Sequence, residues 1–186
     1  MKVILGLGNP GKEYENTRNN AGRIAAEYFS SENDLAFEFD KKSNSFVAEG
    51  KIGKNKITIA LPETFMNKSG MAAAKLVKPR KELKDLIVIH DDLDLPLGKI
   101  KISYGKNSGG HKGVESIMRA LKTKKFVRIR VGISGKKKPP NTLKFIIGKF
   151  KPDEQKILKK VCKKISEALN ILITESLDKA MSICNS

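Results

Sequence analysis

The chain has 186 residues with 37 lysines and arginines against 20 aspartates and glutamates, which gives a formal net charge of +17. Hydrophobic residues make up 39%, and the two cysteines, Cys162 and Cys184, fit neither a zinc-binding spacing nor a disulfide framework. With no apolar run near the roughly 18 residues of a membrane span and no signal-peptide pattern, we expect a cytoplasmic protein that attracts polyanions, nucleic acid first.

Strands and helices alternate along the chain. A short apolar run at 2–7 predicts a buried strand, 23–30 predicts a helix, and strands at 46–52 and 56–61 pair around a turn at Gly53. The remaining predicted elements are a helix at 71–77, strands at 86–89, 99–104 and 126–133, a helix at 114–121 and a long helix from Asp153. This order is typical of an α/β protein: we predict one domain over residues 1–186, a three-layer α/β/α fold with a mostly parallel, mixed central sheet.

The last predicted helix is amphipathic. Its apolar stripe comprises Ile157, Leu158, Val161, Ile165, Leu169 and Leu172, and Cys162 falls on the same stripe as a small core residue. Its other side carries Lys156, Lys159, Lys160, Lys163 and Lys164. Two interpretations of this lysine face stay open: an RNA contact, or an ordinary solvated exterior. A generally lysine-rich composition likewise remains the alternative explanation of the net charge.

Polar loops follow several of the predicted strands. The loops at 8–20, 62–70 and 90–98 each come after a strand, and the glycine-rich loop at 105–113 opens a helix. Ligands of α/β folds bind outside the carboxyl ends of the strands. We therefore expect these loops to meet at one edge of the sheet and to build a single cleft.

Two glycine motifs invite a nucleotide-binding hypothesis. Gly6-x-Gly8-x-x-Gly11 matches the dinucleotide fingerprint, but Pro10 and Gly11 interrupt it and the helical period starts only near Arg23. The fingerprint requires a helix that opens within the glycine turn, so an oxidoreductase is disfavoured. The segment 109–113, Gly-Gly-His-Lys-Gly, could hold a phosphate at the start of a helix or be a flexible turn.

Carboxylates gather at 90–94, His-Asp-Asp-Leu-Asp. A metal site is disfavoured because the chain has two histidines and no matching ligand spacing. A solvated turn is the second alternative, and a carboxylate that orients a neighbouring base is the third. Asn67 precedes a helix and, taken alone, is predicted to cap it.

Together these segments resemble the bacterial-type peptidyl-tRNA hydrolase family over residues 2 to about 150. The motifs that carry the resemblance occur in order: Gly-Leu-Gly-Asn-Pro-Gly at 6–11, Tyr14, Thr17-Arg18, Phe65-Met66-Asn67-x-Ser69-Gly70, His-Asp-Asp-Leu-Asp-Leu-Pro at 90–96, Gly109-Gly110-His111 and Arg-Ile-Arg-Val-Gly-Ile at 128–133. The resemblance implies a monomeric α/β/α hydrolase that cleaves the ester between peptide and tRNA and needs no metal or other cofactor.

The resemblance also implies roles for single residues. Asn9 is similar to the residue that distinguishes blocked from free aminoacyl groups, and Asp91 to the carboxylate that keeps the catalytic base oriented. The positions that resemble tRNA and substrate contacts are Tyr14, Phe65 and Asn67, and those that match the tRNA backbone path are Lys101 and Arg130.

Two positions depart from the family pattern. The family reads Thr-Arg-His-Asn where this chain has Thr17-Arg18-Asn19-Asn20, and it usually has asparagine at the position of Lys112. An amide cannot take a proton from water as an imidazole does, and loss of a general base typically costs about 10²–10⁴ in rate. Asp91 or one of the two histidines, His90 and His111, would have to replace the base. Lys112 adds a cation that can hold tRNA through charge.

Overall fold

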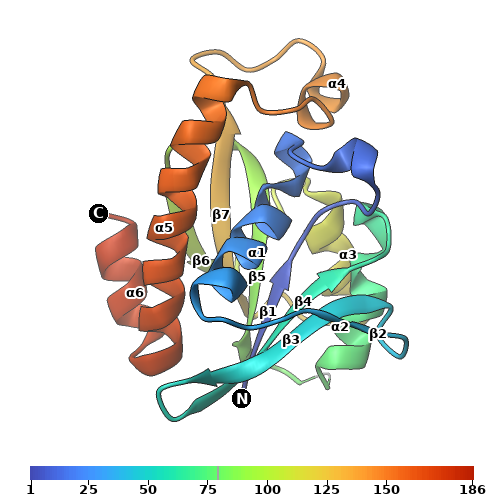
Figure 1. Cartoon of the computed structure of the whole chain (residues 1–186), viewed down its shortest axis with the longest axis vertical. Helices are drawn as coiled ribbons and strands as arrows, with labels where there is room; N and C mark the ends of the chain where they lie inside the picture. The colour runs from blue at the N-terminus through green and yellow to red at the C-terminus, as the bar shows by residue number, and fades with distance from the viewer. Residues whose placement is uncertain (79) are drawn as a thin grey trace.

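A seven-stranded sheet forms the middle of the molecule (Figure 1). The computed structural model describes residues 1–78 and 80–186. The strands lie in the order β2-β3-β4-β1-β5-β7-β6. Their bounds are β1 Lys2–Gly6, β2 Glu38–Asp40, β3 Ser45–Ile52, β4 Asn55–Pro62, β5 Leu83–Pro96, β6 Ile100–Tyr104 and β7 Phe126–Ser134.

The centre of the sheet is parallel and its edges are antiparallel. β1 pairs in parallel with β4 and β5, and β5 pairs in parallel with β7. β2, β3 and β6 run against their neighbours. The β3–β4 hairpin turns at Gly53, whose φ of 58° is a left-handed conformation that glycine adopts without steric cost. The predicted α/β fold with a mixed sheet is confirmed.

Helices cover both faces of the sheet (Figure 1). One face carries α1 (Ala21–Glu32), α5 (Pro152–Thr174) and α6 (Leu177–Cys184), and the other carries α2 (Ser69–Leu76) and α3 (Lys112–Leu121). Side chains of a strand alternate between faces, so Ile87 and Ile89 of β5 enter one hydrophobic cluster and Leu86 and Val88 enter the other. Short segments complete the fold: η1 Lys12–Tyr14, η2 Arg18–Asn20, η3 Met66–Lys68 and α4 Thr142–Ile146.

The first turn of α1 packs directly on β5. A Cβ added to Gly22 would lie 2.1 Å from the carbonyl oxygen of Ile89, which leaves no room for any side chain. Backbone hydrogen bonds reinforce this approach, because Leu7 N–H donates to Ile89 O at 3.0 Å and Arg23 N–H donates to Leu7 O at 3.0 Å. This close contact brings residues 18–20 to the end of β5.

One predicted loop is wrong. Residues 90–96 were expected to leave the sheet with the loop 90–98, but β5 continues to Pro96. His90 and Asp91 still pair with Arg130 and Val131 of β7, and only beyond Asp92 does the register shift. The extension was not predicted because a run of charged residues is typical of loops. In the structure, pairing with β7 keeps His90, Asp91 and Asp92 in the sheet.

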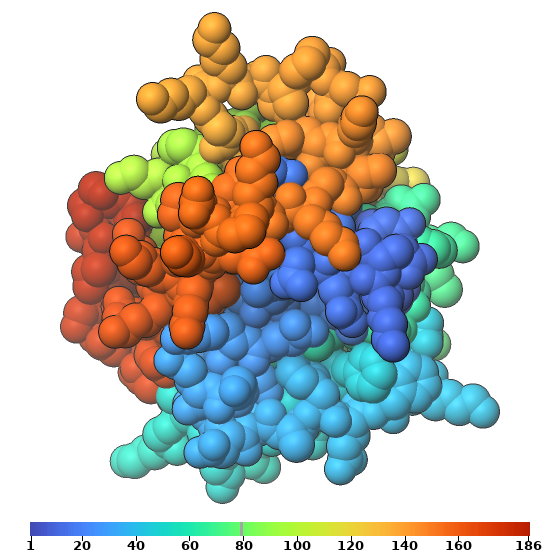
Figure 2. Space-filling model, turned by 45° about the horizontal axis from the view of Figure 1, so that its top comes forward, coloured from blue at the N-terminus to red at the C-terminus, as the bar shows by residue number. Residues whose placement is uncertain are grey.

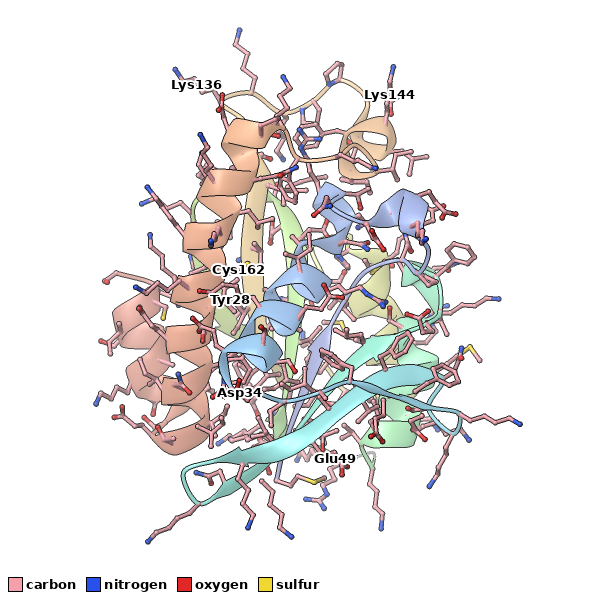
Figure 3. The ribbon with its side chains drawn as sticks, viewed as in Figure 1. Tyr28, Asp34, Glu49, Lys136, Lys144 and Cys162 are labelled. Carbon is pink, nitrogen blue, oxygen red and sulfur yellow. The ribbon has the colours of Figure 1, made fainter. Side chains whose placement is uncertain are left out.

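The long helix predicted from Asp153 corresponds to α5, whereas α6 was not predicted. The long helix ends at Thr174 and α6 follows as a separate helix. Most of the predicted apolar stripe is buried, as is Cys162, which lies on the side of α5 that faces α1 and Tyr28 (Figure 3). Ile157 is the exception at 40% exposure. No sequence pattern predicted the short segments β2 and α4. Within the described ranges, every helix is too short or too polar to cross a membrane.

Candidate active site

A cleft of about 650 Å³ lies at the carboxyl ends of the parallel strands. It is lined by Asn9 and Asn19, by residues 65–67, 90–94 and 108–112, and by parts of 138–147. Figure 2 shows this end of the molecule, where the deep-blue N-terminal turns lie beside the light-orange segment that carries α4. The predicted meeting of the loops around 8–20, 62–70, 90–98 and 105–113 in one cleft is confirmed.

Asp91 is the charged centre of the cleft. It is 4% exposed and held in the β5–β7 ladder. Its Oδ1 accepts a hydrogen bond from Nδ2 of Asn19 at 3.1 Å and lies 2.9 Å from Nε2 of His111. A buried carboxylate with two hydrogen-bond donors is a fixed acceptor that can orient whatever side chain occupies position 19.

Asn19 continues this array toward Asn9. Its Oδ1 accepts from Nδ2 of Asn9 at 3.4 Å, while Oδ1 of Asn9 accepts from the backbone N–H of Met66 at 2.8 Å. The donors all point one way, from Met66 through Asn9 and Asn19 to Asp91. Both ends of the Asn19 amide are therefore engaged, and the amide itself is not basic.

Asn20 is a site residue that the sequence did not reveal. It holds the backbone of Asn9 from both sides: Asn9 N–H donates to Asn20 Oδ1 at 2.8 Å, and Asn20 Nδ2 donates to Asn9 O at 3.0 Å. The resemblance motif includes Asn20, but no spacing indicates that it pairs with a residue eleven positions earlier. These bonds fix Asn9 for its contact with Asn19.

His111 meets Asp91 from the start of α3. Its Nδ1 accepts the backbone N–H of Val114 at 3.2 Å and so caps the helix. In the neutral ring this assigns the proton to Nε2, which donates to Asp91. Both nitrogens are then engaged, and His111 has no free lone pair for a proton from water.

His90 lies behind Asp91 and is fully enclosed. Its Nδ1 is 2.7 Å from the carbonyl oxygen of Asp91, and its Nε2 is 3.3 Å from Nη1 of Arg128. Burial, aided by the nearby His111 and Arg128, lowers the pKa of His90 well below its usual value. His90 is therefore a neutral structural group whose Nε2 is taken by an arginine.

The residues expected to touch substrate are only partly in the cleft. Phe65 and Asn67 line it. Phe65 is 55% exposed, and the centre of its ring is 6.2 Å from that of the nearly perpendicular ring of Tyr14. Tyr14 itself stands outside the lining. The expectation that Asn67 caps a helix is wrong, since α2 begins after Lys68 and no side chain caps it.

The three basic positions differ in their placement. Lys112 lines the cleft at the first turn of α3. Lys101 and Arg130 face each other on β6 and β7, on the face of the sheet that α2 and α3 cover in part. Arg130 reaches the cleft border through an ion pair with Asp92, Nε to Oδ2 at 2.6 Å, while Lys101 lies outside the lining.

An apolar wall completes the cleft. Leu143, Ile146 and Ile147, on and just after α4, line it together with Thr142. Sequence reasoning missed this wall because five helical residues after a basic, proline-containing loop carry no periodic pattern.

Other ligand chemistry finds less support. Among residues 1–78 and 80–186, no group of histidine, cysteine, aspartate and glutamate could hold a metal ion. The turn at Gly11 leads into η1 and the first α-helix begins only at Ala21, so the glycine fingerprint lacks its helix N-terminus. The loop at Gly109 and Gly110 does open a helix, and it lines the cleft.

Comparisons with known proteins agree on one family. The family model described as peptidyl-tRNA hydrolase matches residues 3–186. The chain is 42% identical to a peptidyl-tRNA hydrolase of Dehalococcoides mccartyi, with all of both chains covered, and 39% identical to one of Aquifex aeolicus, with 100% of this chain and 96% of that protein covered. The crystal structure of the Acinetobacter baumannii peptidyl-tRNA hydrolase superposes with a TM-score of 0.92 at 28% identity, covering 100% of this chain and 95% of that one. The chain belongs to the peptidyl-tRNA hydrolase family.

Proposed function

We propose that this chain hydrolyses the ester between a peptide and the 3′ ribose of tRNA, releasing tRNA for reuse, at a rate that Asn19 reduces. The observation that carries the proposal is the array Asn9–Asn19–Asp91 in a cleft large enough for the acylated end of an RNA. Family membership supports the reaction class. We keep two expectations: a cytoplasmic location, which rests on the sequence pattern, and a monomer that serves translation, which rests on the resemblance.

The reaction adds water to the ester carbonyl. The water oxygen bonds to the carbonyl carbon, its proton goes to a base, and the bond to the 3′ oxygen breaks as that oxygen gains a proton. Asn19 can hold the water by a hydrogen bond but cannot receive its proton. Asp91 is the charged acceptor beside it, and a carboxylate is a weaker base than an imidazole.

Neither histidine can replace the missing general base. In His111, Nδ1 accepts the Val114 N–H and Nε2 donates to Asp91, so neither nitrogen offers a free lone pair to water. His90 is enclosed and its Nε2 faces Arg128. We therefore expect slow turnover, with Asp91 receiving the proton.

The RNA contacts follow the basic and aromatic positions around the cleft. Phe65 offers an exposed aromatic ring, with the ring of Tyr14 nearly perpendicular to it and Asn67 beside it as an amide. Lys101 and Arg130 supply cations for the RNA backbone, and Lys112 supplies one inside the cleft. Because such contacts release counterions, binding should weaken as salt rises.

Single-turnover cleavage of a blocked aminoacyl-tRNA tests the proposal. We expect Asn19→His to raise the rate by at least about 10²-fold, since it restores an imidazole beside Asp91. Asn19→Gln is the matched control, because it lengthens the side chain without adding a base and should give no gain. Adding Asp91→Asn to Asn19→His should remove most of the gain. A wild-type rate equal to that of Asn19→His would contradict the role given to position 19.

A second function is supported by the engaged lone pairs of His90 and His111. The chain would then bind peptidyl-tRNA or another RNA without cleaving it. Salt-sensitive binding with no wild-type cleavage, together with cleavage by Asn19→His, would favour this alternative. Binding that does not change with salt would exclude RNA as the partner.

A further inference from the structure

The apolar wall of the cleft is held partly by packing, because Phe145 and Ile146 lie against the larger hydrophobic cluster. α4 spans Thr142–Ile146 and contains no buried residue. Leu143 is 64% exposed, and Lys136 and Lys144 on either side of it extend into solvent at the end of the molecule (Figure 3). A helix of this length is not stable alone, so contacts from elsewhere must hold it.

Arg18 adds stacking and hydrogen-bond contacts to that packing. Its guanidinium carbon lies 4.3 Å from the centre of the Phe145 ring, and its Nη1 reaches Phe145 O at 3.4 Å. Its backbone N–H donates to Gly148 O at 3.0 Å, next to a bridge between Thr17 and Lys149. Arg18 therefore contacts α4 through its side chain and the residues that follow α4 through its backbone.

The other end of the guanidinium is anchored to α5. Nη2 of Arg18 pairs with Oε2 of Glu154 at 2.9 Å, and the Arg18 side chain is only 8% exposed. Glu154 is itself fixed, because the same oxygen accepts the backbone N–H of Lys151 at 2.7 Å at the start of α5. A largely dehydrated, hydrogen-bonded pair of this kind resists separation more than a surface pair does.

Arg18 directly precedes Asn19 in η2. The Asn19 side chain contacts Asp91 in the cleft, while the Arg18 side chain runs beneath α4 to Glu154. We propose that Arg18 is a positioning residue that fixes α4 relative to the turn carrying Asn19 and thereby sets the shape of the cleft. The identity of the occupant, an acylated tRNA end, rests on the proposed function.

The chemistry of the contact requires arginine. A planar guanidinium can stack on Phe145 while its separate nitrogens reach a carbonyl and a carboxylate. A lysine can keep the charge near Glu154 but cannot make the stacked and forked contacts together. Arg18→Lys therefore removes the side-chain contacts with α4 while it retains the charge and the backbone bond to Gly148.

The test combines two measurements on Arg18→Lys. Amide hydrogen exchange over residues 142–147 should become faster by about tenfold, because α4 opens more often. The Kd and KM for a blocked aminoacyl-tRNA should rise by about tenfold. The single-turnover rate constant should change by less than about threefold, since Asn19 and Asp91 stay in place. Glu154→Gln should shift the same quantities in the same direction, and the double variant should be less than additive because both break one contact.

Ile165→Val is the matched control. Ile165 is fully buried in α5 away from α4, so this change lowers the melting temperature without loosening residues 142–147 or raising Kd. Unchanged exchange in Arg18→Lys, or faster exchange with unchanged Kd and KM, would overturn the proposal. So would equal changes in Ile165→Val. If the wild type bound no acylated tRNA yet Arg18→Lys still loosened α4, the proposed function would fail and the positioning of α4 by Arg18 would stand.

Discussion

The two sides of the cleft are built in different ways. Asp91 and His90 lie in a paired strand, with 4% and 1% of their surfaces exposed. Across the same lining, Leu143 is 64% exposed on a short helix that Arg18 holds through its side chain and backbone. Asp91, the proposed proton acceptor, is thus fixed by backbone pairing, whereas the α4 side of the cleft depends on side-chain packing and on the contacts of Arg18.

The largest expected effect comes from crowding the sheet side. Gly22→Ala would place a methyl group 2.1 Å from the carbonyl oxygen of Ile89. We expect it to lower the free energy of unfolding by about 3 kcal/mol, since α1 must move away from β5. Denaturant titration measures this loss.

Gly135→Ala is the matched change in the loop that leads to α4. A Cβ there meets nothing within 4 Å, so its free energy of unfolding should stay within about 0.5 kcal/mol of the wild type. Similar losses in the two variants would break the contrast between the two sides.

A smaller effect should appear in acid. The lowered pKa of His90, caused first by burial, means that the folded protein resists a proton that the unfolded chain accepts below about pH 6.5. The unfolded state then binds more protons, so the free energy of unfolding is intact above that pH and falls as the pH drops from 6.5. Unfolding measured at pH 7.5 and at pH 5 tests this.

His90→Gln sharpens the acid experiment. The glutamine side chain can still accept a hydrogen bond from Arg128 but does not titrate. Part of the fall in the free energy of unfolding between pH 7.5 and pH 5 should therefore disappear, even if the variant is less stable at both pH values. An unchanged loss would remove His90 from the explanation.

The smallest effect on stability is expected at the apolar wall. Leu143→Ala should change the free energy of unfolding by less than about 0.5 kcal/mol, because the side chain is mostly exposed. Its affinity for a blocked aminoacyl-tRNA should nevertheless fall several-fold, since Leu143 lines the cleft. Fluorescence anisotropy measures the affinity, and an unchanged Kd would show that the wall does not touch the occupant.

Sequence patterns predicted the parts of the fold that periodicity controls. The apolar strand at 2–7, the hairpin around Gly53 and the buried stripe of α5 follow from alternation and helical spacing. The extension of β5 through Asp92 was missed because pairing with β7 is a long-range property, which no local pattern records. The helix α4 was missed for the same reason, since its contacts with Arg18 and with the larger hydrophobic cluster are also long-range.

The candidate site divides in the same way. Asn9, Asn19 and Asp91 were expected together, from loops at strand ends and from the family resemblance, and the hydrogen bonds join them. The roles of Asn20 and Arg18 depend on contacts across the fold, to Asn9 and to Glu154, that sequence spacing cannot specify. The positioning role proposed for Arg18 is a prediction for the experiments above.

Side chains of β6 and β7 alternate between the two faces of the sheet, and two groups of cations lie on opposite faces of it. Lys101 and Arg130 lie on the face that carries α2 and α3, whereas the lysines of α5 lie beyond the opposite face. An RNA arm laid along the first group would have the whole sheet between itself and the second. The α5 lysines would then raise the association rate of a polyanion through an electrostatic field that salt screens within about 8 Å. They would not lower its dissociation rate.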